Sequence, residues 1–202
     1  MKFKLLIAAF GLLMGANSAM AAGDAAAGEG KSAMCAGCHG ADGKSVANMF
    51  PNLAGQHASY IAKQLADFKS NKRTDATMAG MVAALTEEDM ADLGAFFASK
   101  PAAEGKADDE AKVGLGQEMF RGGNSSTHVP ACSGCHGPTG KGNPAARYPA
   151  LAGQHAAYTI KQLKAFRDAS RANDPNTMMR KVAEHMSDRE IEAVANYIAG
   201  MK

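Results

Sequence analysis

The sequence lacks the patterns that mark three common classes of protein. Beyond its first residues it has no continuous apolar run of the roughly 20 residues that a membrane-spanning helix needs. It has no run of alternating β-branched residues, which argues against a protein built from strands. Its formal net charge is only +2 and it has no stripe of mixed aromatic and basic residues, so nucleic-acid binding is not supported. We therefore expect a soluble, helical protein without a transmembrane segment.

The first 21 residues have the pattern of a cleaved export signal. Lys2 and Lys4 precede an apolar run from Leu5 to Met14, and Ala19-Met20-Ala21 is a small-x-small cleavage signature. The sequence thus predicts a signal peptide at 1–21 and a mature protein located in the periplasm. About 181 residues remain (202 minus 21), which suits two small domains whose apolar cores alone would be marginal.

The four cysteines form two Cys-x-x-Cys-His motifs, at Cys35–His39 and Cys132–His136. Two thiols at this spacing reach the two vinyl groups of a haem, and the adjacent imidazole reaches its iron. Structural disulfides and a zinc site are the alternatives. Each motif is complete with its own histidine and the two lie 97 residues apart, so we predict two covalently bound haem c groups. The predicted attachment residues are Cys35, Cys38, Cys132 and Cys135, and the predicted first iron ligands are His39 and His136.

The chain repeats itself well beyond these motifs. Residues 51–60 return 98 positions later as 149–158, Lys63-Gln64-Leu65 returns as Lys161-Gln162-Leu163, and Arg73 returns as Arg171. A repeat of this length indicates that the chain contains two copies of one domain. The stretch 101–112 is polar and contains Pro101 and Gly105, so we expect a linker there, between an N-terminal domain at 22–100 and a C-terminal domain at 113–202.

The second axial ligands have to be chosen among thirteen methionines. A thioether opposite histidine is typical of electron-transfer haems. Each half ends in a predicted helix capped by Thr86 or Ser187, 101 residues apart, and this offset aligns Met78 with Met179. We predict Met78 and Met179 as the ligands; a slip in the alignment would select Met81 or Met178 instead. The equivalent residues His57 and His155 are expected at a loop or helix start.

These residues together resemble the cytochrome c4 family. The resemblance rests on the tandem haem motifs, the Pro-x-Leu-Ala-Gly-Gln segments after Phe50 and Tyr148, the Tyr-x-x-Lys-Gln-Leu helices and the late methionines. It implies an all-α fold of two tandem class I cytochrome c domains related by a pseudo-twofold axis. It also implies His39, Met78, His136 and Met179 as iron ligands, and backbone carbonyls at Pro51 and Pro149 that accept the Nδ1–H of the proximal histidines.

The resemblance further implies an electron carrier rather than an enzyme. Its partners would be a quinol-cytochrome c reductase and a haem-copper terminal oxidase of the respiratory chain, with peripheral membrane association left open. An electron-accepting dihaem subunit of a flavoprotein dehydrogenase would have the same sequence pattern. A dihaem peroxidase or a sulfur-compound oxidising enzyme would need one iron with an open position, whereas both halves here offer a methionine.

The charge of the chain is unevenly distributed. Residues 22–100 carry 7 basic and 9 acidic side chains, whereas 113–202 carry 11 and 7. Such asymmetry can orient an encounter with a charged partner. We therefore expect a surface for an acidic redox partner in the second half, formed by Lys161, Lys164, Arg167, Arg171, Arg180 and Lys181.

Overall fold

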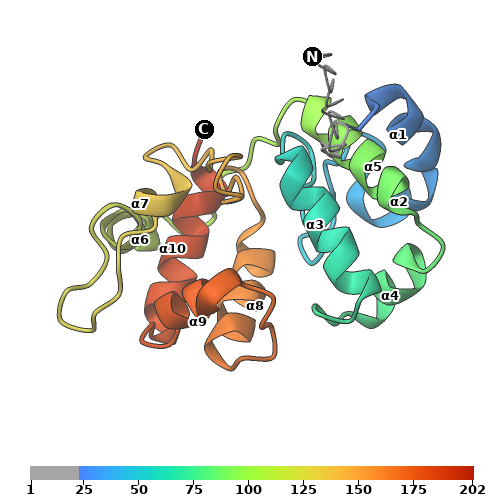
Figure 1. Ribbon diagram of the computed structural model, residues 1–202. Helices are drawn as coiled ribbons and strands as arrows, with labels where there is room; N and C mark the ends of the chain where they lie inside the picture. Colours follow the sequence, from blue (N-terminus) through green and yellow to red (C-terminus); the bar gives the residue numbers. More distant parts are fainter. Residues whose placement is uncertain (1–22) are drawn as a thin grey trace, which may run out of the picture.

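The computed structural model describes residues 23–202, so the predicted signal peptide lies outside the described residues (Figure 1). The first half of the chain forms five helices within residues 23–100. They are α1 (Ala25–Lys31), α2 (Ala33–His39), α3 (Ala58–Lys69), α4 (Ala76–Val82) and α5 (Glu87–Ser99). None of the helices in residues 23–202 is long and apolar enough to cross a bilayer.

The second half repeats this order beside the first, and Figure 1 shows the two halves joined by one linking segment. Its elements are α6 (Glu110–Gly122), α7 (Ser133–His136), α8 (Ala156–Arg167), the 3-10 turn η1 (Pro175–Thr177), α9 (Met178–Ala183) and α10 (Asp188–Gly200). In residues 23–202 the only β features are two isolated bridges, Asn124 with Val129 and Asn143 with Tyr148. The predicted all-α fold of two domains is confirmed.

The first and last helices of each half cross at a glycine. A Cβ atom on Gly28 in α1 would lie 2.1 Å from the carbonyl oxygen of Asp92 in α5. A Cβ atom on Gly116 in α6 would lie 2.2 Å from the carbonyl oxygen of Ala193 in α10. Real Cβ atoms do not approach oxygen this closely, so only glycine permits these two helix backbones to touch.

The closing helices begin with the caps that the sequence predicts. The hydroxyl of Thr86 accepts a hydrogen bond from the amide of Asp89, and Ser187 does the same for Glu190; in both cases the acidic side chain bonds back to the cap amide. This capping box satisfies amides that have no partner inside the helix. Behind the caps, α5 and α10 bury Leu93 and Ile191 completely in the two apolar cores.

The linking segment is packed rather than free. A Cβ atom on Gly55 would meet Ala102 at 2.8 Å, and one on Gly153 would meet the carbonyl oxygen of Ala103 at 2.1 Å, so this segment passes between both halves. Helix α6 starts at Glu110, inside the stretch that we predict as a linker. The domain boundaries at 22–100, 101–112 and 113–202 stay a prediction.

The two halves meet along α3 and α8 through a reciprocal polar network. The guanidinium of Arg73 donates to Gln64 at 2.8 Å in its own half and, across the junction, to Tyr158 at 3.0 Å and Gln162 at 2.9 Å. Arg171 mirrors these bonds, donating to Gln162, Tyr60 and Gln64 at 2.7, 3.2 and 3.1 Å. Since each contact recurs with the halves exchanged, the halves are related by a pseudo-twofold axis.

Candidate haem-binding sites

Each motif lies at a short helix that ends on its histidine. Cys35, Cys38 and His39 belong to α2, while Cys132 caps α7 and Cys135 and His136 lie within it. The chain then turns sharply at Gly40 (φ +79°) and Gly137 (φ +77°), a backbone region that favours glycine. The turn brings the following loop back over the histidine in both halves.

Both histidine rings are held by a backbone carbonyl. His39 Nδ1 lies 2.9 Å from the carbonyl oxygen of Pro51, and His136 Nδ1 lies 2.9 Å from that of Pro149. A carbonyl can only accept, so Nδ1 carries the proton and Nε2 carries the free lone pair. The carbonyl contacts that we expected from the family resemblance are confirmed. They orient the two rings in the same way and leave the same nitrogen to bind iron.

The surroundings keep these imidazoles neutral. Burial lowers the pKa of both His39 and His136, and the bond to the proline carbonyl opposes this only in part. An aromatic ring packs at a centroid distance of 6.2 Å from each, Phe50 against His39 and Tyr148 against His136. A neutral imidazole with one fixed tautomer is the form that ligates a metal.

The first cysteine of each motif, Cys35 or Cys132, does not have the properties of a catalytic thiol. Burial raises the pKa of Cys35 and raises that of Cys132 to about 11, whereas a reactive cysteine has a lowered pKa. None of the four cysteines is joined to another in a disulfide within residues 23–202. No group of three or more His, Cys, Asp or Glu side chains converges as a metal cluster within residues 23–202. Two thiols and one neutral histidine per site therefore fit covalent haem attachment better than zinc or a disulfide.

The candidate methionines lie on α4 and α9. Met78 is half-buried and packs against the same apolar cluster as Cys35, whereas Met81 is not among the residues packed against it. In the second half, Met178 and Met179 are both half-buried at the start of α9. Met78 is therefore supported by packing, and the choice between Met178 and Met179 depends on the repeat.

The loops before α4 and α9 explain why the repeat changes its offset. Arg73 and Arg171 are 98 residues apart, but Met78 and Met179 are 101 apart, so the second half has three extra residues between them. The structure places η1 in this interval, with Asn176 and Thr177 at positive φ. The length change is taken up by this turn before α9 begins.

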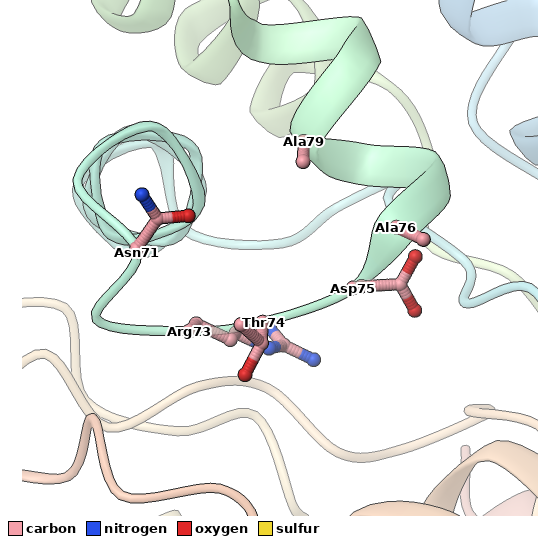
Figure 2. A pocket seen from close by; sticks show the side chains of 6 residues that line it. All are labelled: Asn71, Arg73, Thr74, Asp75, Ala76 and Ala79. Atoms are coloured by element: carbon pink, nitrogen blue, oxygen red, sulfur yellow. The ribbon is translucent and has the colours of Figure 1, made fainter.

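An open hollow of about 430 Å³ lies beside the loop that leads to α4 (Figure 2). Its lining consists of Asn71, Arg73, Thr74, Asp75, Ala76 and Ala79. It includes no cysteine or histidine of the motifs, nor Met78. Ala76 and Ala79 nevertheless belong to α4, the helix that carries Met78.

Some side chains at the junction lie in the repeated segments, but their contacts were not predicted from the sequence. Gln56 and Gln154 belong to the repeated segments, and in the structure each bonds to the backbone of the opposite half. His57 and His155 precede α3 and α8, as expected, and Nε2 of His155 lies 3.0 Å from the carbonyl oxygen of Ser45 across the junction. A repeat shows that a residue occupies equivalent positions in both halves, but it does not show which residues its side chain contacts.

The comparisons with known proteins agree with this geometry. The Cytochrome c family model matches residues 25–100 and again 115–202. Cytochrome c4 of Pseudomonas aeruginosa is 46% identical over 199 residues, 98% of this chain and 98% of that protein. The crystal structure of reduced recombinant cytochrome c4 from Pseudomonas stutzeri matches with a TM-score of 0.87 and 46% identity, covering 90% of this chain and 100% of that one. A thiosulfate dehydrogenase electron acceptor of Stutzerimonas stutzeri is 43% identical over 170 residues, 83% of this chain and 78% of that protein.

Proposed function

The chain belongs to the cytochrome c4 family, and from that premise we propose which residues carry its electrons and between which partners. It is an electron-transfer protein rather than an enzyme, and it carries two covalently bound haem c groups. Haem iron supplies a reversible change between the ferric and ferrous states. The polypeptide supplies attachment, axial ligands and exclusion of water.

We assign the two haem sites symmetrically. Cys35 with Cys38, and Cys132 with Cys135, would hold the haems through thioether bonds. His39 with Met78, and His136 with Met179, would bind the two irons. The observation that carries the histidine assignment is the His–Pro contact of 2.9 Å that occurs in both halves. The Met78 assignment is supported by the packing of Met78 and Cys35 on one cluster. With a methionine opposite each histidine, neither iron would keep a position open for a substrate, which disfavours the dihaem peroxidase.

The route of the electrons is a finer proposal. We place the protein in the periplasm, between a quinol-oxidising reductase and a haem-copper terminal oxidase. A second candidate donor is a dehydrogenase, because one relative is described as a thiosulfate dehydrogenase electron acceptor. Rates of reduction of the purified holoprotein by a quinol-oxidising reductase and by thiosulfate dehydrogenase with thiosulfate distinguish the two donors.

The axial ligands are tested by replacing each methionine in the holoprotein. Met78→His and Met179→His should each remove the far-red sulfur-to-iron absorbance of one haem and lower its reduction potential by on the order of 100 mV or more, because an imidazole stabilises ferrous iron less than a thioether. Met81→Leu and Met178→Leu are the matched controls and should leave the far-red absorbance intact. Loss of the band in a control variant instead would transfer the ligand role to that methionine.

A further inference from the structure

Two glutamines join the halves through a reciprocal pair of hydrogen bonds. The amide N–H of Asn52 donates to Oε1 of Gln154 at 2.9 Å, and Nε2 of Gln154 donates to the carbonyl oxygen of Asn52 at 3.0 Å. With the halves exchanged, the amide N–H of Ala150 donates to Oε1 of Gln56 at 2.9 Å, and Nε2 of Gln56 donates to the carbonyl oxygen of Ala150 at 2.9 Å. Each glutamine side chain thus forms two hydrogen bonds with the backbone of the opposite half.

The peptide group whose N–H donates to the opposite half is also the one whose carbonyl hydrogen-bonds the histidine ring. The carbonyl of Pro51, which binds His39, and the N–H of Asn52, which binds Gln154, are two ends of a single peptide group. The carbonyl of Pro149 and the N–H of Ala150 stand in the same relation to His136 and Gln56. One continuous hydrogen-bonded chain therefore runs from each histidine ring, through one peptide group, to a glutamine of the other half.

A peptide group transmits polarisation because its C–N bond has partial double-bond character. An acceptor on the N–H increases the negative charge on the carbonyl oxygen, which then binds the Nδ1–H of the histidine more strongly. A stronger bond at Nδ1 makes the ring a more electron-donating ligand at Nε2. More donation stabilises ferric iron, so the glutamine should lower the reduction potential.

We propose that the two glutamines are positioning residues that act crosswise: Gln154 of the second half tunes the haem of the first half through His39, and Gln56 of the first half tunes the haem of the second half through His136. The inference rests on the proposed roles of His39 and His136 as iron ligands. It goes beyond them, because it makes each haem dependent on a side chain of the other domain.

A purely local role of the glutamines, or a general loosening of the junction, would give a different pattern. Gln154 Oε1 also accepts from the amide of His155 in its own half at 3.0 Å, and Gln56 Oε1 does so from His57, so a local role would affect the haem of the same half. A loosened junction would affect both haems together. Only transmission through the peptide group predicts that the effect appears in the opposite half.

The test is a redox titration of the holoprotein variants Gln154→Met and Gln56→Met, which keep the length of the side chain and remove its polar atoms. The two redox waves are assigned by which one moves in Met78→His and which in Met179→His. Gln154→Met should raise the potential of the wave assigned to the first half and leave the other within the shift seen in the control. Gln56→Met should do the reverse.

The control is Arg73→Gln, which removes bonds across the junction without touching either proline loop. In the reduced, diamagnetic protein, proton NMR gives a second reading, since the Nδ1–H signal of His39 should move in Gln154→Met and that of His136 in Gln56→Met. Effects in the same half, in both halves equally or in neither would overturn the crosswise proposal. If the wild-type protein lacks His–Met spectra, the ligand assignment itself is wrong, which is a separate failure.

Discussion

Lys31 in α1 lies between two carboxylates that belong to α5. Its Nζ is 2.7 Å from Asp89 and 2.7 Å from Asp92, and Asp92 also accepts the backbone amide of Asp24 at 2.8 Å. The bond to Lys31, followed by the one to Asp24, holds the pKa of Asp92 below its ordinary value, and Lys31 with Thr86 does the same for Asp89. These contacts join the first and last helices of the N-terminal half through charge as well as packing.

The lowered pKa values predict a stability that depends on pH. A carboxylate with a lowered folded-state pKa stabilises the fold above its unfolded pKa of about 3.9, and this contribution is lost as the pH falls through the folded-state value. The free energy of unfolding of the wild type should therefore fall more steeply between about pH 5 and pH 2 than that of Lys31→Gln. Denaturant titrations followed by circular dichroism measure this. Lys72→Gln, at an exposed lysine, is the control and should follow the wild type; equal slopes for Lys31→Gln would contradict the prediction.

The crossings of α1 with α5 and of α6 with α10 are the most sterically restricted contacts between elements. Gly28→Ala should destabilise the protein by about 1–3 kcal/mol, because the new methyl group can be accommodated only if the two backbones separate. Gly30→Ala on the same helix has nothing within 4 Å of the new Cβ and should instead stabilise by about 0.5–1 kcal/mol. Chemical denaturation of both variants measures the difference. A neutral Gly28→Ala would mean that the helices do not depend on this close approach.

The same helices show which structural features can be predicted from the sequence alone and which cannot. The caps at Thr86 and Ser187 are predictable because a hydroxyl followed by acidic residues has a local cause. The start of α6 at Glu110, inside the stretch that we predict as a linker, is not predictable in this way. Asp109 caps this helix, and its amide is bound by Asn196 of α10, 87 residues away. The equivalence of Gly28 and Gly116 is hidden as well, since they lie 7 and 16 residues before the first cysteine of their motifs.

The predicted haem sites also combine contacts that follow from the sequence with contacts that do not. The cysteines and histidines follow from a local motif, and the carbonyl contact of Pro51 follows from the family resemblance. The bond from Gln154 to Asn52 does not, because the repeat is consistent with either a contact inside one half or a contact between halves. Only the fold distinguishes them.

At the scale of the whole molecule, the basic surface that we expected in the second half is largely neutralised. Lys164 and Arg167 pair with Asp188 at 2.7 and 2.6 Å, and Arg180 pairs with Asp174 at 2.8 Å. Lys181 and Lys161 also have acidic partners, and Arg171 is buried in the junction. Three exposed basic residues close to the second haem motif form no ion pair within residues 23–202: Arg121, Lys141 and Arg147.

The first haem motif is flanked by exposed apolar residues rather than by basic ones. The exposed side chains near it include Met34, Val46 and Met49, and no charged residue occurs between Lys44 and Lys63. In the second half, Arg147 stands 98 positions after Met49. The exposed surroundings of the two haem motifs are therefore suited to partners of different kinds, one with an apolar contact surface and one with an acidic surface.

This asymmetry predicts how association responds to salt. Replacing Arg121, Lys141 and Arg147 with Gln should slow electron exchange with an acidic redox protein by about tenfold at low ionic strength, and the difference should disappear at high ionic strength. Stopped-flow absorbance measures the rate. The matched control replaces Lys164 and Arg167, whose charges are already paired, and should have little effect. A larger effect in this control would restore the surface that the sequence suggested.

The reciprocal glutamine bonds also bear on how a duplicated gene can evolve. A substitution at Gln56 or Gln154 disturbs the copy in which it does not occur, so the two copies are not free to diverge independently along this junction. Other positions of the repeat have already diverged, since Met49 in one copy corresponds to Arg147 in the other. Selection can therefore change exposed residues of one copy to suit a separate partner, while the hydrogen bonds across the junction continue to require matching residues in both copies.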